Sequence, residues 1–163
     1  MKIGILSDSH DHVDNLRRVL DRLREEEVEA AIHCGDYCAP FVLNELDQLG
    51  VPVHGVFGNV DGDRHLMTRL TYTELERVHL HGEVAELELG GRRIGVNHYP
   101  VLAEGLAATG RFDLVAHGHT HEARSTTVGA CRLVNPGEVM GLKGPVGFAV
   151  ADLGSGEVSL LTL

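Results

Sequence analysis

The first 57 residues alternate short apolar runs with segments of helical periodicity. Apolar runs occupy residues 2–7 (KIGILS), 28–34 (VEAAIHC) and 51–57 (VPVHGVF). Between them, residues 12–27 and 40–49 carry leucine and valine at the spacing of an amphipathic helix. This β-α-β-α-β order favours a parallel sheet with helices packed on it.

The second half of the chain is richer in strands. Residues 83–97 predict a β-hairpin whose turn is Gly90-Gly91, and residues 101–110 predict a helix. Further strands are predicted at 113–118, 123–135, 146–153 and 157–163, joined by short turns. No linker, charge block or repeat divides the chain. We therefore expect one domain, 1–163, with two stacked sheets and outer helices, which suits this length.

Composition excludes several classes of protein. No apolar run approaches the ~20 residues of a membrane helix, and the N-terminus lacks a signal-peptide layout, so a cytoplasmic protein is expected. The chain has three cysteines, Cys34, Cys38 and Cys131, and the CxxxC spacing of the first two does not suit a zinc knuckle. They are interpreted as reduced thiols. The formal net charge of −10 argues against general nucleic-acid binding. Bound metal cations would still permit a small anionic substrate.

Polar residues follow the predicted strands at the points where the apolar runs end. Because loops beyond the carboxyl ends of strands gather at one edge of an α/β sheet, these residues are expected to converge. The run HGHTH also places three histidines on alternating positions, which in an extended segment would share one face. The residues expected to meet are Asp8, His10, Asp36, Asn59, His98 and the histidine cluster His117, His119 and His121.

Oxygen and imidazole donors together suit divalent Mn, Fe, Co, Ni or Zn. A carboxylate can bridge two cations roughly 3.5–4 Å apart, and Asp36, alone after its strand, is the candidate bridge. Gly35, Gly58 and Gly118 would allow close approach of backbone and metal. The competing interpretation is ordinary loop polarity, in which these side chains cap helices and stabilise turns.

Five short motifs in order resemble the signature of the calcineurin-like metallophosphoesterases. They are DSH (8–10), GD (35–36), GNVD (58–61), NH (97–98) and GHTH (118–121). The segment from His117 to Gly141, which includes NPG at 135–137, is similar to the tail of the small bacterial and archaeal phosphodiesterase branch. The resemblance covers almost the whole chain. It implies an α/β fold, a four-layer α/β/β/α sandwich of two mixed β-sheets flanked by helices.

The resemblance also implies a dinuclear centre and a mechanism. Asp8, His10 and His121 would bind one metal ion together with bridging Asp36. The second ion would be bound by Asp36, Asn59, His98 and His119. A metal-bridging hydroxide would attack phosphorus in line, and the cations would neutralise charge on the phosphoryl oxygens. Asp36, Asn59 and His98 are the catalytic candidates; manganese is the first expectation for both ions, with nickel, cobalt, iron or zinc as alternatives.

Three positions depart from the family pattern. Val60 stands where many members carry a histidine that protonates the leaving group, so His12 or a metal-bound water is the substitute donor considered. Tyr99 stands where a glycine commonly follows the ligand histidine, and it would narrow the pocket or donate a hydrogen bond to phosphate. Asp11 replaces a common glycine and adds negative charge near the mouth. Val60 and Asp11 both favour diesters over monoesters.

Other polar residues receive supporting roles. His117 is interpreted as a buried histidine near the ligands and Asp61 as a support for the ligand loop. Asp63 and Arg64 are expected on a solvated face, and residues 135–138 are expected to form a turn near the site without a catalytic group.

Two functions are consistent with the residues that match the family pattern. The first is a metal-dependent phosphodiesterase, a phosphoric ester hydrolase acting on small or nucleotide-like phosphodiesters. The alternative is a catalytically weak or silent protein-binding scaffold of the same fold, as in retromer-type subunits. All seven ligand positions carry Asp, Asn or His, which favours the enzyme. No membrane partner is expected, and the resemblance to this branch allows a homodimer.

Overall fold

A computed structural model describes all residues, 1–163. Its first sheet has six strands in the order β11-β10-β1-β2-β3-β4. Strands β1 to β4 run parallel, while β10 pairs antiparallel with β1 and with β11. The bounds are β1 Lys2–Leu6, β2 Ala30–His33, β3 Val53–Gly55, β4 Val78–Leu80, β10 Gly147–Asp152 and β11 Glu157–Thr162.

The second sheet has five strands in the order β5-β6-β7-β9-β8. Its central strands β6, β7 and β9 are parallel, and the two edge strands β5 and β8 are antiparallel to their neighbours. The predicted hairpin is present, with Gly90 and Gly91 both at positive φ in its turn. The bounds are β5 Val84–Leu89, β6 Arg92–Asn97, β7 Leu114–Ala116, β8 Arg124–Val128 and β9 Cys131–Asn135.

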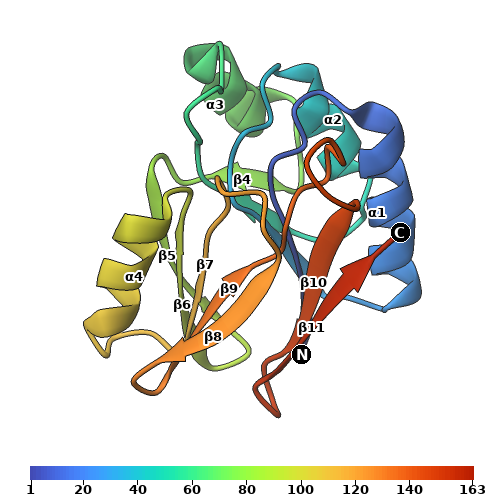
Figure 1. The fold of residues 1–163 in the computed structure, drawn as a ribbon. Coiled ribbons are helices and arrows are strands. Elements are labelled where there is room, and N and C mark those ends of the chain that lie inside the picture. The colour runs from blue at the N-terminus through green and yellow to red at the C-terminus, as the bar shows by residue number, and fades with distance from the viewer.

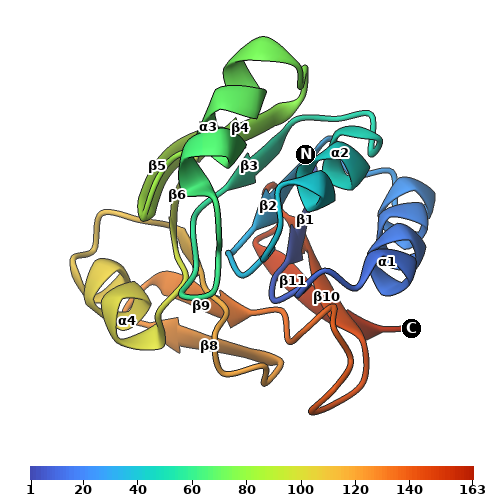
Figure 2. The same ribbon diagram turned by 90° about the horizontal axis from the view of Figure 1, so that it is seen from above.

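Helices cover the outer faces of both sheets, so that the predicted four-layer α/β/β/α sandwich is confirmed (Figures 1 and 2). Helices α1 and α2 lie on the side of the six-stranded sheet, and α4 lies on the opposite side of the molecule against the five-stranded sheet. The bounds are α1 Val13–Glu25, α2 Phe41–Asp47, α3 Arg64–Thr73 and α4 Pro100–Ala108. No helix is both long enough and apolar enough to span a lipid bilayer.

Strand β1 explains how one apolar run serves two core layers. Ile3 and Ile5 pack between the sheets, whereas Leu6 packs under the helices with Leu23 of α1. This division follows from the alternation of side chains along a strand. Gly4 lets α1 approach the sheet, because a Cβ there would lie 2.7 Å from the Leu23 side chain. The apolar runs are buried on both faces, as a sheet covered on both sides requires.

The region from 63 to 80 contains elements that the periodicity did not predict. Helix α3 buries only Met67 and Leu70, so its apolar face is too narrow to stand out in the sequence. The Asp63 carboxylate caps this helix by accepting the Leu66 N–H at 2.8 Å. Strand β4 has three residues and joins the sheet only through β3. Its identity as a strand depends on that pairing.

Candidate metal centre

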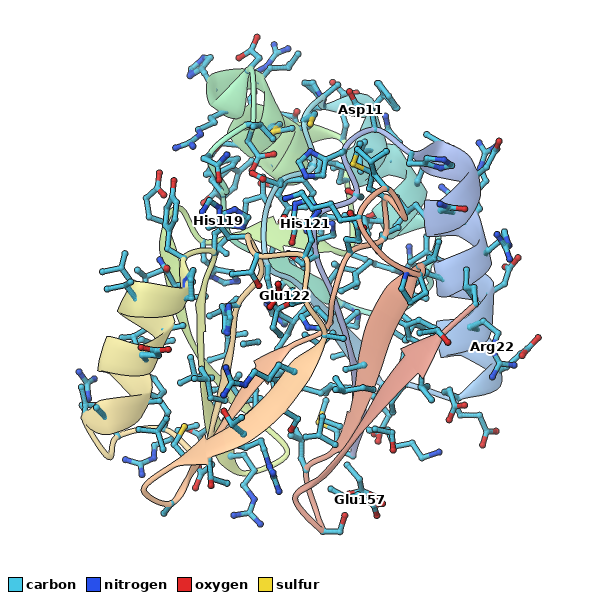
Figure 3. All side chains as sticks on the ribbon, viewed as in Figure 1. Asp11, Arg22, His119, His121, Glu122 and Glu157 are labelled. Atoms are coloured by element: carbon cyan, nitrogen blue, oxygen red, sulfur yellow. The ribbon has the colours of Figure 1, made fainter.

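The candidate ligands lie at the carboxyl ends of five strands that belong to both sheets. Asp8 and His10 follow β1, Asp36 follows β2, Asn59 follows β3, His98 follows β6, and His119 and His121 follow β7. Figure 3 places His119, His121 and Asp11 near one end of the sandwich, while Glu157, at the start of β11, lies at the other end. The structure therefore brings all seven sequence-predicted residues together at one edge.

The first group of ligands surrounds a buried oxygen of Asp8. Asp8 Oδ1 lies 3.2 Å from His121 Nε2 and 3.8 Å from His10 Nε2, and the two imidazole nitrogens are 3.4 Å apart. Asp36 Oδ2 lies 3.7 Å from His10 Nε2. Asp8 is fully buried, and its Oδ1 has no hydrogen-bond donor. A buried carboxylate oxygen without a donor is costly unless a cation compensates it.

The second group shares Asp36 with the first. Asp36 Oδ2 lies 3.4 Å from His98 Nε2, which is 3.0 Å from Asn59 Oδ1. His119 Nδ1 lies 2.8 Å from Asn59 Oδ1 and 3.3 Å from His98 Nε2. His98 and Asp36 are buried, whereas Asn59 and His119 are exposed. The second group is therefore the side that a ligand in solution can reach.

Backbone conformation at the site is unusual for residues other than glycine. Eight such residues in the chain have positive φ, and five of them are candidate ligands. Positive φ costs energy for a residue with a Cβ and persists only where the surroundings impose it. The five are Asp8 (φ 55°), His10 (42°), Asp36 (60°), His119 (73°) and His121 (65°). Their concentration here supports a functional interpretation over simple loop polarity.

Glycines around the site make room for the carboxylates. A Cβ at Gly58 would lie 2.1 Å from Asp36 Oδ1, and a Cβ at Gly118 would lie 2.5 Å from Asp8 Oδ2. Gly35 combines a φ of +100° with a backbone atom of Gly58 2.6 Å from its Cβ position. These three positions therefore require glycine for close approach, as the sequence predicts.

Hydrogen bonds fix which nitrogen of two histidines is free to bind a metal. His98 Nδ1 lies 2.8 Å from the Cys34 carbonyl oxygen, which can only accept, so Nδ1 carries the hydrogen and Nε2 faces the site. His121 Nδ1 is 2.6 Å from Glu138 Oε2, and its Nε2 likewise faces Asp8. Such partners orient ligand histidines and raise their basicity.

Glu138 has a larger role than the predicted turn at 135–138 implies. Its side chain is fully buried, and its carboxylate contacts a candidate ligand. The other oxygen, Oε1, accepts the backbone N–H groups of Lys143 (2.5 Å) and Gly144 (2.7 Å). In the sequence, a glutamate that directly follows the NPG turn can be either buried or exposed. Only the three-dimensional contact reveals its role.

Asp61 supports the ligand loop, in keeping with its predicted role. Its carboxylate accepts four backbone N–H groups, from Tyr37 at 2.6 Å and Gly58 at 2.6 Å as well as from Asp36 and Cys38. This one buried side chain therefore ties the loop after β2 to the loop after β3. Asp36 and Asn59 are held in register by it.

Three other predicted residues have distinct positions. Tyr99 precedes α4, and its ring centroid lies 5.2 Å from that of His119, so it borders the open side of the site. His12 is exposed and caps α1, with Nδ1 accepting the Asn15 N–H at 3.3 Å. Arg64, expected on a solvated face, hydrogen-bonds to the Gly58 carbonyl and to Glu83. Arg64 thus secures the loop that carries Asn59.

The expectation that alternating histidines of HGHTH share one face is wrong for His117. The chain leaves the extended conformation after β7, because His119 and His121 both adopt positive φ. His117 is buried, and it lines a separate cavity between α4 and β8 that also contains Thr120 and Arg124. His119 and His121 instead enter different ligand groups. The positive φ values turn the loop at each ligand.

The charges of the ligand groups reinforce one another. Burial by itself raises the pKa of Asp8 and of Asp36, but the neighbouring His10 and His98 imidazoles outweigh it, and both pKa values fall below the ordinary range. The pKa of His10 rises, chiefly because of Asp8. For His98, burial opposes protonation, yet Asp36 and Asp8 raise its pKa. Both carboxylates are therefore ionised at neutral pH and act only as acceptors.

The residues present fit divalent transition-metal ions. Asp8, His10 and His121 place ligand atoms within 4.8 Å of one another, and Asp8, Asp36 and His98 do the same. Neighbouring ligands on one ion at bond lengths of about 2.0–2.2 Å lie roughly 3 Å apart, close to the separations described above. The mixed imidazole and carboxylate donors suit these ions better than calcium or magnesium. The buried Asp8 Oδ1 atom, which has no hydrogen-bond donor, independently supports a bound cation at this position.

Comparison with known proteins places this geometry in a family. A phosphodiesterase of Methanocaldococcus jannaschii, MJ0936, is 32% identical over 143 residues, which are 86% of either chain. A solved structure of an archaeal phosphodiesterase superposes with a TM-score of 0.92 at 31% identity and covers 100% of both chains. Vps29 of Chaetomium thermophilum has the same fold, with a TM-score of 0.73 at 13% identity over 100% of this chain and 95% of that one.

The family model described as the calcineurin-like phosphoesterase superfamily domain matches residues 1–156. That match spans both sheets up to the turn before β11, and every candidate ligand lies inside it. The resemblance of the five motifs is thereby confirmed. Taken with the 32% identity to an archaeal phosphodiesterase, it means that the chain belongs to the calcineurin-like phosphoesterases, a metal-dependent family, and to their small archaeal and bacterial branch.

Proposed function

We propose that this protein is a phosphodiesterase that uses two divalent transition-metal ions to hydrolyse small or nucleotide-like phosphodiesters. The observation that carries the proposal is the position of Asp36. One oxygen, Oδ2, lies 3.7 Å from His10 in the first ligand group and 3.4 Å from His98 in the second. A carboxylate between two sets of imidazoles is suited to bridge two cations.

In this assignment Asp8, His10 and His121 would hold the first ion, and Asn59, His98 and His119 would hold the second. Asp36 belongs to both. Manganese is the first expectation, and nickel, cobalt, iron or zinc would fit the same mixed oxygen and nitrogen donors. When bound, the ions would activate a water molecule as the nucleophile and neutralise charge on the phosphoryl oxygens.

The chain's own residues hold this arrangement in place before substrate arrives. Asp61 fixes the two loops that carry Asp36 and Asn59 through four backbone hydrogen bonds. The Cys34 carbonyl and Glu138 keep the Nε2 atoms of His98 and His121 directed at the site. Such fixed ligands reduce the reorganisation that the reaction requires. The exposed Asn59 and His119 mark the side from which a phosphodiester would enter.

The features at the open side favour diesters over monoesters. Val60 is 43% exposed beside Asn59 and has no proton to give to a leaving group. Asp11 is exposed near the site and adds negative charge, which disfavours the more highly charged monoesters. The net charge of −10 opposes long nucleic acids. A small diester with a good leaving group is the substrate that these features suit.

The test compares two esters with and without metal. Protein stripped by a chelator should release p-nitrophenol from bis(p-nitrophenyl) phosphate only after Mn²⁺, Ni²⁺ or Co²⁺ is added, and faster than from the monoester. Asp36→Asn should abolish turnover, because the bridging charge is lost, while circular dichroism stays native. Asp63→Asn is the matched control, since Asp63 caps α3 outside the site and asparagine caps helices equally well. No metal-dependent release from either ester would favour the scaffold alternative.

A further inference from the structure

Three histidines outside the candidate centre meet on the edge of the six-stranded sheet. His54 of β3 is paired in register with His79 of β4, and His81 lies two residues beyond His79 on the same face. The His54 ring centroid is 5.4 Å from that of His79 and 5.3 Å from that of His81. The three imidazoles border one surface depression of about 320 Å³, together with Thr71 and Tyr72 of α3.

Two ring nitrogens of this cluster already have the spacing of metal ligands. His54 Nδ1 and His81 Nε2 are 3.0 Å apart. Two imidazoles on one tetrahedral ion, with bonds of about 2.0–2.1 Å, place their nitrogens roughly 3.3 Å apart. His54 is half-buried, while His79 and His81 are exposed, so that an ion from solution can reach the pair. No His79 nitrogen lies within 4.8 Å of both nitrogens of this pair, so His79 would join the ion only after its ring turns toward them.

The surroundings of His54 and His81 favour the neutral form of their imidazoles. Burial, followed by the nearby His81 and His79, lowers the pKa of His54 to about 4. The pKa of His81 is lowered for the same two kinds of reason, burial first and then His79. No carboxylate hydrogen-bonds to or forms an ion pair with any of the three. Neutral imidazole is the form that binds metal.

We propose that His54 and His81, with His79 as the third ligand, form a transition-metal site separate from the phosphodiesterase centre. An all-imidazole donor set suits Cu²⁺, Ni²⁺ and Zn²⁺ and disfavours Mg²⁺ and Ca²⁺. A bound ion would join β3 to the three-residue edge strand β4, which otherwise pairs only with β3. Binding should therefore raise the thermal stability of this edge.

The first measurement uses the untagged, chelator-stripped wild-type chain. Histidine ring nitrogens are followed by ¹⁵N-edited NMR during Zn²⁺ titration, in parallel with isothermal titration calorimetry. The resonances of His54 and His81 should shift together in one saturable step, and the melting temperature should rise. If these resonances stay unchanged at saturating Zn²⁺ while those of the phosphodiesterase centre move, the proposal is overturned.

The second measurement counts ions. His54→Asn and His81→Asn should each bind one Zn²⁺ fewer per chain than wild type and should retain phosphodiesterase activity. His65→Asn is the control, because His65 is an exposed histidine of α3 that does not border the depression. Equal ion counts in all four proteins would contradict the site. Repeating the count in the Asp36→Asn background separates this result from any failure of the dinuclear proposal.

Discussion

The Glu138 carboxylate lies 2.6 Å from Nδ1 of His121, a pairing of a fully buried acid with a candidate metal ligand 17 residues away. Its second oxygen accepts two backbone N–H groups from the loop that follows. The loop after β9 and the histidine loop after β7 are thus joined at the ligand itself. Glu138 therefore positions His121 without needing to touch a metal ion or a substrate.

Replacing Glu138 by glutamine tests this positioning. Glu138→Gln keeps the shape but removes the charge that holds His121 Nδ1–H, so metal affinity should fall by about 10–100-fold. Calorimetric titration with Mn²⁺ measures the change, and Glu138→Asp should restore part of it if the charge is the cause. Glu122→Gln is the control, since Glu122 is exposed near the same loop. Unchanged affinity in Glu138→Gln would contradict the role.

Gly58 and Gly105 form a contrasting pair of glycines. Gly58→Ala would put a Cβ 2.1 Å from Asp36 Oδ1, so we expect lost turnover and destabilisation of about 1–3 kcal/mol. Gly105 lies inside α4, where a Cβ would meet nothing within 4 Å, and Gly105→Ala should stabilise by roughly 0.5–1 kcal/mol. Urea denaturation and the diester assay measure both. Full activity in Gly58→Ala would count against the close packing of Asp36.

Val60 offers a test of the leaving-group step. Its backbone N–H donates to Asp36 Oδ1 at 3.0 Å, so a side chain at this position is held beside the site. In the wild type, rates should fall steeply as the pKa of the leaving group rises. Val60→His would supply a proton donor and should flatten that dependence, whereas Val60→Gln should not. A flat wild-type profile across a series of aryl diesters would be the contrary result.

His33 makes folding stability depend on pH. Complete burial lowers its pKa to about 3, and the Gly35 N–H donates to Nδ1 at 3.2 Å, which requires the neutral ring. The unfolded chain binds this proton below pH 6.5 and the folded chain only below about 3, so this contribution to stability falls as pH drops between those values.

Replacing His33 by glutamine should remove this dependence. His33→Gln should lessen the loss of stability with acid, by up to about 1.4 kcal/mol per pH unit in that window. Urea midpoints of the metal-free wild type and variant, measured from pH 4 to 7, provide the comparison. Parallel curves for the two proteins would mean that His33 does not titrate between the folded and unfolded states. The lowered pKa of Asp8 and Asp36 affects both proteins alike.

Much of this protein could be predicted from local sequence. The period of the apolar residues located α1, α2 and most of the strands, because each of these elements buries one or both faces and its pattern is therefore visible in the chain. The polar residues that interrupt those runs located the ligand loops, because ligand positions follow strand ends, and the family resemblance of the five motifs reduced them to seven candidate ligands. The glycines were informative for the same local reason: only glycine leaves room beside the carboxylates at positions 58 and 118 and beside the Gly58 backbone at position 35.

Tertiary structure decided the remaining features. The direction of His117 depended on the positive φ values of the loop that follows it, which strand periodicity does not encode. Strand β4 and the meeting of His54 with His79 and His81 depend on a pairing between segments about 25 residues apart. The contact of Glu138 with His121 arises where two loops from different strands close on each other. A sequence pattern reports which face of an element is buried, but contacts between elements come from how whole layers pack.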